Sequence, residues 1–211
     1  MNKIKCIVFD MDGVLIDARD WHYEALNQAL RIFGHEISRH DHLVTYDGLP
    51  TLKKLEILSS YSNLPKQLHP FINELKQIFT LDITLAKCRP TFCHEYALAK
   101  LKTNGYKLAV CSNSVRDTIT SMLTKAGIIN LFDFYLSNQD VGKSKPDPEI
   151  YTKAIERFGI SPSECLVLED NVNGIKAATD AGAHVMQIHQ VTDVNYLNIA
   201  NFIKKIESAA C

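Results

Sequence analysis

The stretch that decides the fold lies near the amino terminus, where residues 4–13 read IKCIVFDMDG. Its run of apolar and β-branched residues predicts a buried β-strand, and this strand ends in two carboxylates, Asp10 and Asp12, followed by a glycine turn. A buried strand does not end in neighbouring anions unless a cation or a reactive group compensates their charge. The sequence therefore predicts a functional site at the carboxyl end of this strand.

Length and charge restrict the class of protein. The chain has 211 residues, a hydrophobic fraction of 46% and a net charge of −1, which are typical of one globular core with a modest insertion. Because its charges are well mixed, we expect neither nucleic acid nor an anionic membrane as a partner. We expect a small, locally charged ligand and a monomeric protein, since a helical insertion that closes over such a ligand must move freely.

Apolar segments and cysteines give no sign of export. No apolar run is long enough to span a bilayer, and the amino terminus lacks an apolar region followed by a small-residue cleavage site, so we expect a cytoplasmic protein. The cysteines lack the spacing of metal ligands and are expected to be buried, reduced thiols. They are Cys6, Cys111 and Cys165, which fall in predicted strands, and Cys88, Cys93 and Cys211.

Apolar periodicity changes twice along the chain. Residues 17–88 show helical spacing without strand signals, which predicts a small all-helical insertion. From Pro90 onward, helices and strands alternate and glycines end the helices, as in a parallel sheet wrapped by helices. We therefore predict an α/β fold in which residues 1–16 and 89–211 form a Rossmann-like parallel sheet flanked by helices. The strands after the first are expected at residues 107–111, 132–136, 165–168 and 184–188.

Polar residues follow three of the predicted strands, where an open parallel sheet binds its ligands. The first strand ends in Asp10 and Asp12, the second is followed by Ser112-Asn113-Ser114, and the fourth by Glu169-Asp170-Asn171. The segment Lys143-Ser144-Lys145-Pro146-Asp147-Pro148 lies between them in sequence. Carboxylates gathered at one edge would repel each other without a cation, and an all-oxygen set suits Mg²⁺ better than zinc or copper.

These residue types together predict phosphoryl transfer. Ser112 and Asn113 precede a helix, where hydroxyl, amide and backbone N–H groups can hold an anion, and Lys145 adds a positive charge. Asp10 would then be the nucleophile that forms an aspartyl phosphate. Asp12 would donate a proton to the leaving oxygen and afterwards take one from water.

Four motifs resemble the haloacid dehalogenase-type phosphatases, in the subgroup that includes beta-phosphoglucomutase and phosphoglycolate phosphatase. The resemblance covers the whole predicted core, and the helical insertion at residues 17–88 occupies the place of that family's cap domain. The motifs read DMDGVL at residues 10–15, CSNS at 111–114, KSKPDPE at 143–149 and LEDNVNG at 168–174.

The resemblance implies a role for each matched residue. Asp10 would be nucleophile and metal ligand, and Asp12 would be the acid/base that also binds Mg²⁺ through its backbone carbonyl. Ser112 and Lys145 would hold the transferring phosphoryl group, and Asn113 would reach it through its backbone N–H. Asp170 would be the remaining carboxylate at the metal, with Glu169 as a ligand or a neighbour of the ligands.

Simpler interpretations compete at several residues. A calcium-binding EF-hand loop that started at Asp10 would need a carboxylate where Trp21 stands, which excludes that motif. Ser112 could serve merely as the N-cap of the following helix. Lys143 is expected on the surface. His22 and the charges at Lys53, Lys54, Lys76, Lys87 and Arg89 are expected to be mostly solvated, although one or two of these cations could meet the substrate.

The leading prediction is a magnesium-dependent phosphatase that acts on a small phosphomonoester, such as a sugar phosphate. The main alternative is a sugar phosphomutase, but beta-phosphoglucomutases carry an arginine shortly after the cap glycine, and here Gly48 is followed by Leu49, Pro50, Thr51, Leu52 and Lys53. A dehalogenase is disfavoured because those enzymes lack the second aspartate, which is Asp12 here. A catalytically silent binding protein would be expected to lack some of these catalytic and metal-binding residues, and all of them are present here.

Overall fold

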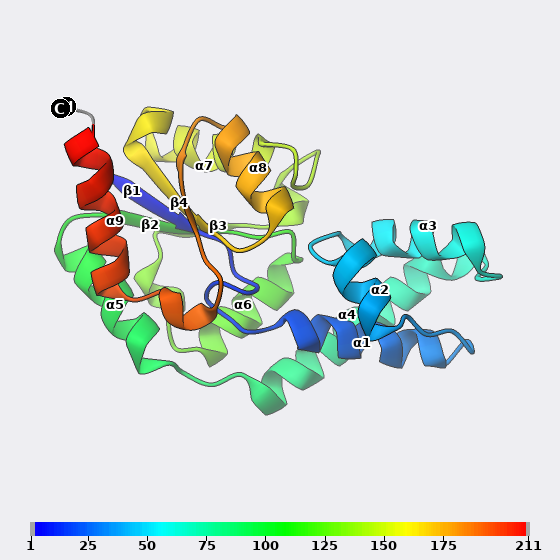
Figure 1. Cartoon of the computed structure of the whole chain (residues 1–211). Helices are drawn as coiled ribbons and strands as arrows, with labels where there is room; N and C mark the ends of the chain where they lie inside the picture. The colour runs from blue at the N-terminus through cyan, green and yellow to red at the C-terminus, as the bar shows by residue number, and fades with distance from the viewer. Residues whose placement is uncertain (1–2, 210–211) are drawn as a thin grey trace. The chain divides into compact units, whose positions relative to one another are not determined.

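The chain divides into two compact units. The computed structural model describes residues 3–209. The first unit, here called the core unit, contains the residues up to Asp17 and those from Arg89 onward, whereas the second, the cap unit, is Ala18–Cys88. The sheet belongs entirely to the core unit, and residues 18–88 form helices and turns (Figure 1).

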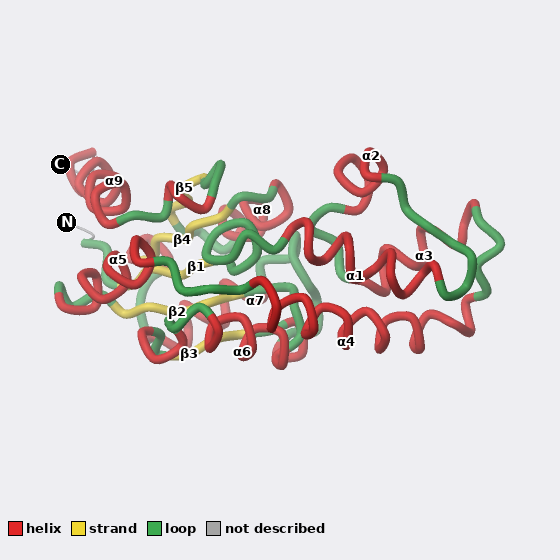
Figure 2. The backbone as a smooth tube through the Cα atoms, turned by 90° about the horizontal axis from the view of Figure 1, so that it is seen from below, coloured by secondary structure: helices red, strands yellow, loops and turns green. Residues whose placement is uncertain are grey.

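A five-stranded parallel sheet forms the centre of the core unit. The strands stand in the order β3-β2-β1-β4-β5, which is visible in the tube view (Figure 2). Their bounds are β1 (Cys6–Phe9), β2 (Lys107–Cys111), β3 (Phe134–Leu136), β4 (Cys165–Glu169) and β5 (His184–Gln187). The predicted α/β class with a parallel sheet is therefore confirmed.

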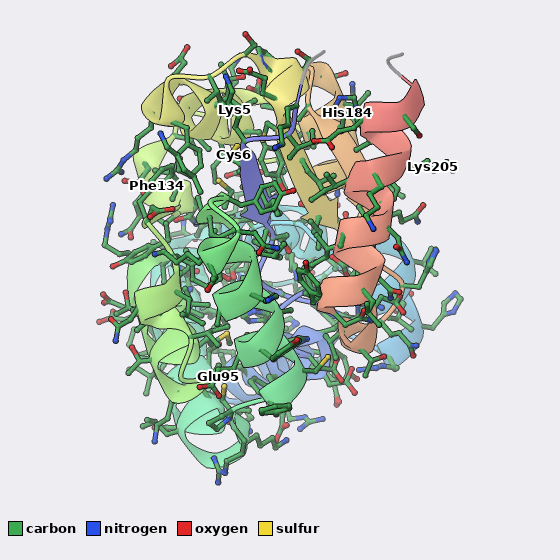
Figure 3. All side chains as sticks on the ribbon, turned by 90° about the vertical axis from the view of Figure 1, so that its left-hand side faces the viewer. Lys5, Cys6, Glu95, Phe134, His184 and Lys205 are labelled. Atoms are coloured by element: carbon green, nitrogen blue, oxygen red, sulfur yellow. The ribbon has the colours of Figure 1, made fainter. Side chains whose placement is uncertain are left out.

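Strand β1 is central because it pairs with β2 on one side and β4 on the other. Its side chains are buried on both faces of the sheet, as its uninterrupted apolar sequence predicts. Its last residue, Phe9, is in register with Val110 of β2 and with Leu168 of β4. Figure 3 shows the opposite edge, where Cys6, Phe134 and His184 begin their strands. The carboxyl ends of β1, β2 and β4 therefore lie level with one another.

Helices cover both faces of this sheet. Helices α7 and α8 lie on one face and α5 and α6 on the other (Figure 1), and α9 packs beside α5. Side chains of β1 such as Val8 pack with Tyr151 and Ala154 of α7 and with Ala177 of α8. The helices are α5 (Phe92–Thr103), α6 (Arg116–Lys125), α7 (Glu149–Phe158), α8 (Val172–Asp180) and α9 (Tyr196–Ala209), with 3₁₀ turns at Ile129–Leu131, Asn138–Asp140, Pro162–Glu164 and Val191–Asp193.

The cap unit has its own apolar interior. Leu26 and Leu30 of its first helix pack with Leu55, Leu58 and Ile72 of its later helices. The predicted helices are present, but the segment between α1 and α3 is also helical, because elements this short show no sequence period. The bounds are α1 (Arg19–Arg31), α2 (Arg39–Asp41), the π-helical η1 (His42–Tyr46), α3 (Thr51–Tyr61), the 3₁₀ turn η2 (Lys66–Leu68) and α4 (His69–Lys87).

The cysteines within residues 3–209 are free thiols. Those in the three central strands and Cys88 are buried as expected, but Cys93 is exposed at the start of α5, which corrects the expectation that all were buried. Cys211 lies outside the described residues. Within residues 3–209, no helix is both long and apolar enough to cross a membrane.

Candidate functional site

The structure brings the carboxylates predicted from the sequence to one edge of the sheet. Asp10 directly follows β1, and its backbone N–H donates to Leu168 O of β4 at 3.0 Å, which joins the two strand ends. Glu169 is the last residue of β4, and Asp170 is the next. Oxygens of Asp10, Glu169 and Asp170 lie within 4.8 Å of one another, although Asp10 and Glu169 are buried.

Lys145 joins two of these carboxylates. Its Nζ donates to Asp10 Oδ1 at 2.7 Å, to Glu169 Oε1 at 2.6 Å and to the carbonyl of Cys111 at 2.8 Å. The Lys145 side chain is 4% exposed, so all three ammonium protons are used in a buried place, as a buried cation requires. Asn113 fixes the backbone of Lys145, since Lys145 N–H donates to Asn113 Oδ1 at 3.1 Å.

Electrostatics at this edge favour a further cation. Burial raises the pKa of Asp10 well above its usual value; Lys145 opposes this effect, whereas Glu169, Asp12 and Asp170 add to it. Burial alone would lower the pKa of Lys145, but Asp10 and Glu169 raise it above its usual value. Lys145 is therefore a stable cation, and one positive charge is too little for this group of carboxylates.

The donor set fits a magnesium ion. Asp10, Glu169 and Asp170 offer only carboxylate oxygens, which hard cations such as Mg²⁺ prefer. Two glycines give these carboxylates their space. A Cβ on Gly13 would lie 2.1 Å from Asp170 Oδ2, and a Cβ on Gly174 would lie 1.8 Å from Glu169 Oε1. Gly13 also has φ +84°, which favours glycine.

Asp12 and Ser112 extend the site along the loops after β1 and β2. Ser114 Oγ donates to Asp12 Oδ2 at 3.0 Å. Ser112 is buried, and its Oγ accepts the N–H of Ser114 at 3.1 Å. The N-cap of α6 is Val115, with no side-chain capping bond. Ser112 therefore does not serve as the N-cap of the following helix, which was the simpler interpretation of this residue.

The loop that carries Lys145 is held by Glu149. Its carboxylate accepts N–H bonds from Gly142 at 3.0 Å and from Lys143 at 2.9 Å, and it pairs with Lys153 at 2.7 Å. The contact with Lys153 has the largest effect, and together with the two backbone bonds it lowers the pKa of Glu149 to about 2. Lys143 itself is exposed, as expected from the sequence.

Two contributors to the site are not predicted from the sequence. Ser114 belongs to a predicted motif without a predicted role of its own, yet it contacts Asp12. Tyr151 lies outside the predicted motifs, yet its hydroxyl donates to Glu169 Oε1 at 2.6 Å from within the core. The sequence signal for Tyr151 is a polar hydroxyl on the apolar face of α7, where Ile150, Ala154 and Ile155 are also buried.

Most of the cations expected to be solvated are exposed, but two of them in the cap unit are buried. Lys54 and Lys76 are 8% and 7% exposed. Lys76 Nζ lies 3.1 Å from Nδ1 of His22, so this histidine is not a simple surface residue. Buried His42 has its pKa lowered to about 4, first by its burial and then by Lys54. By contrast, Lys53 and Lys87 are exposed and form surface ion pairs, and Arg89 is also exposed.

Comparison with known proteins identifies the family. The model of the family described as "Haloacid dehalogenase-like hydrolase" matches residues 7–188. A phosphorylated carbohydrates phosphatase of Thermotoga maritima is 30% identical over 198 residues, which span 90% of this chain and 88% of that protein. This match and the family model confirm the resemblance predicted from the four motifs.

Solved structures share the fold. Beta-phosphoglucomutase of Clostridium difficile superposes with a TM-score of 0.81 at 21% identity, covering 97% of this chain and 99% of the other. CbbY of Rhodobacter sphaeroides in complex with phosphate gives a TM-score of 0.75 at 22% identity, covering 86% and 84%. At these identities the likeness concerns the fold alone.

Proposed function

The chain belongs to the haloacid dehalogenase-like hydrolase family, and we propose that it is a magnesium-dependent phosphatase that hydrolyses a small phosphomonoester through an aspartyl phosphate on Asp10. The observation that carries this proposal is the bridge made by Lys145 between Asp10 and Glu169, at 2.7 and 2.6 Å. It joins parts of three predicted motifs at one edge of the sheet.

The reaction uses this chain's residues in two steps. An Asp10 carboxylate oxygen attacks phosphorus, and the bond from phosphorus to the leaving oxygen breaks while Asp12 gives that oxygen a proton. Water then attacks the phosphorus of the aspartyl phosphate, Asp12 takes its proton, and Asp10 leaves as a carboxylate. When bound by Asp10, the Asp12 carbonyl, Asp170 and Glu169, Mg²⁺ would offset the charge that gathers on the phosphoryl oxygens.

Other residues have supporting roles in the proposal. Ser112 and the backbone N–H of Asn113 hold phosphoryl oxygens, and Lys145 favours the ionised form of Asp10 and adds positive charge beside the transferring group. Ser114 orients Asp12 through its hydrogen bond at 3.0 Å. Similarity to a phosphorylated carbohydrates phosphatase supports sugar phosphates as the first substrates to test.

Release of inorganic phosphate tests this function. The wild-type chain is screened with Mg²⁺ against sugar phosphates, nucleotides, phosphoglycolate and glycerol phosphate. Asp10→Asn is expected to lose about 1,000-fold or more of the activity on every good substrate, whereas Asp17→Asn, a change at an exposed aspartate of the same unit, should keep it. Full activity of Asp10→Asn would contradict the proposal.

A mutase assay separates the main alternative. The chain is incubated with glucose 1-phosphate and a bisphosphate primer, and glucose 6-phosphate is measured beside free phosphate. The phosphatase proposal predicts that phosphate is the product. Efficient conversion to glucose 6-phosphate without release of phosphate would assign the chain to the mutases instead.

A further inference from the structure

We propose that Tyr151 is a positioning residue for this site, which holds Glu169 Oε1 in place so that Glu169 faces the metal with Oε2 alone. The inference rests on the proposed function, since it concerns the same carboxylates. Tyr151 lies on α7, between the loop of Lys145 and strand β4, and it belongs to none of the four motifs. It is completely buried.

Tyr151 and Lys145 share one oxygen of Glu169. The Tyr151 hydroxyl donates to Oε1 at 2.6 Å, and Lys145 Nζ donates to the same oxygen at 2.6 Å. The ammonium also lies 4.7 Å from the centre of the Tyr151 ring. Tyr151 therefore contacts both charged partners of the bridge and fixes their relative positions.

The two donors use up the acceptor capacity of Oε1. A carboxylate oxygen has two lone-pair directions, and here one receives the phenol and the other the ammonium. The second oxygen, Oε2, accepts only a long bond of 3.4 Å from the N–H of Asn171 among the hydrogen bonds described. Bidentate metal binding by Glu169 would break one of the bonds to Oε1, so Oε2 is the oxygen left for the cation or its water.

Helix α8 holds the carboxylate from another direction. A Cβ on Gly174 would lie 1.8 Å from Oε1 and 2.3 Å from Oε2, so Glu169 packs directly against the backbone of this glycine. A phenylalanine at position 151 would fill the same space as tyrosine but would leave Glu169 without its phenol donor. The hydroxyl of Tyr151 therefore serves the orientation of Glu169 rather than the packing of α7.

The test is Tyr151→Phe in the full chain, with Mn²⁺ as the metal probe and no substrate present. Binding of Mn²⁺ is followed by electron paramagnetic resonance, and kcat and KM are measured separately with Mg²⁺ on the best substrate. We expect Mn²⁺ to bind about 10-fold more weakly and kcat to fall by a similar factor, with KM nearly unchanged. The matched control is Tyr135→Phe in the same unit. It removes a hydroxyl that accepts a hydrogen bond from Thr120 Oγ1, and it should keep the wild-type Mn²⁺ affinity.

A second variant shows whether the effect passes through Glu169. In a Glu169→Gln background, Tyr151→Phe should weaken Mn²⁺ binding little further, because the carboxylate that it orients is already gone. Wild-type Mn²⁺ affinity in Tyr151→Phe would overturn the proposal, as would an undiminished effect in the Glu169→Gln background. Because these titrations need no turnover, they remain informative if Asp10→Asn shows that the proposed function is wrong.

Discussion

Both units bury polar side chains, but they treat them differently. In the core unit, Lys145 is almost completely buried and each of its protons has an acceptor within 2.8 Å. In the cap unit, His42 and Tyr46 are equally buried, yet neither ring nitrogen of His42 nor the hydroxyl of Tyr46 has a hydrogen-bond partner among residues 3–209. Burial of a polar group without a partner costs free energy.

This contrast indicates which unit is arranged for chemistry. Partners of Lys145 come from the residue after β1 and from the ends of β2 and β4, so three strands hold the charges in place. In the core site the bonds of Lys145 offset part of the repulsion among the carboxylates, whereas His42 and Tyr46 reduce the stability of the cap unit. The contrast predicts opposite results for matched substitutions in the two units.

The largest effect is expected at Lys145. Lys145→Met removes the cation and leaves Asp10 and Glu169 buried beside each other, so the free energy of unfolding should fall by about 3–5 kcal/mol and phosphatase activity should be lost. Chemical denaturation and phosphate release measure the two effects. Lys143→Met, in the same loop but exposed, should change stability by less than about 0.5 kcal/mol. An equal loss in both variants would contradict the claim that the contacts of Lys145 with Asp10 and Glu169 stabilise the fold.

The pH dependence of stability tests His42. Its pKa is lowered to about 4 in the folded chain and lies near 6.5 when unfolded, so the unfolded state binds more protons between these values. The free energy of unfolding is therefore highest above pH 6.5, where His42 is neutral in both states. It falls as the pH falls towards 4, by on the order of 3 kcal/mol.

Substitution isolates that contribution. Urea denaturation at pH 7 and pH 4.5 should show a smaller difference in His42→Phe than in the wild type. His40→Phe, at an exposed histidine of the same segment, should keep the wild-type difference. Lys54, Arg39 and His22 help to lower the pKa of His42, whereas Asp47 opposes this effect. Unchanged pH dependence in His42→Phe would contradict the assignment to His42.

A smaller loss is expected at Gly174. Gly174→Ala places a methyl group 1.8 Å from Glu169 Oε1, so either α8 or the carboxylate must move, at a cost of about 1–3 kcal/mol. Thermal unfolding measures this cost. Gly142→Ala is the matched control, because its Cβ would meet its nearest neighbour, Glu149 Oε2, at an ordinary 3.5 Å. Equal stability of the two variants would show that the carboxylate is loosely held.

The smallest effect has the opposite sign. Tyr46→Phe removes a buried hydroxyl without a hydrogen-bond partner among the described residues and should raise the free energy of unfolding by up to about 1 kcal/mol. Thermal unfolding of this variant beside Tyr151→Phe compares the two units directly. Destabilisation by Tyr46→Phe would mean that the cap satisfies this hydroxyl after all.

The same contrast explains how much the sequence predicts. Central strands such as Cys6–Phe9 are predictable because they are apolar without interruption, and Asp10, Ser112 and Glu169 because parallel strands bring their carboxyl ends to one edge. Tyr151 is not predictable in this way, since its role depends on the direction in which a helix presents its hydroxyl. The burial of Lys54 and Lys76 depends likewise on packing between distant residues, and the turn at His42–Tyr46 is too short to show a period.

The central claim is that Asp10 carries the phosphoryl group during turnover. Its most direct test is to quench the reacting enzyme, reduce the acyl phosphate with borohydride and examine the peptides by mass spectrometry. The account predicts conversion of Asp10 to homoserine only when substrate and Mg²⁺ are both present, with no conversion of Asp12 or Asp170. Reduction at another carboxylate, or intact Asp10 while phosphate is released in a burst, would contradict it.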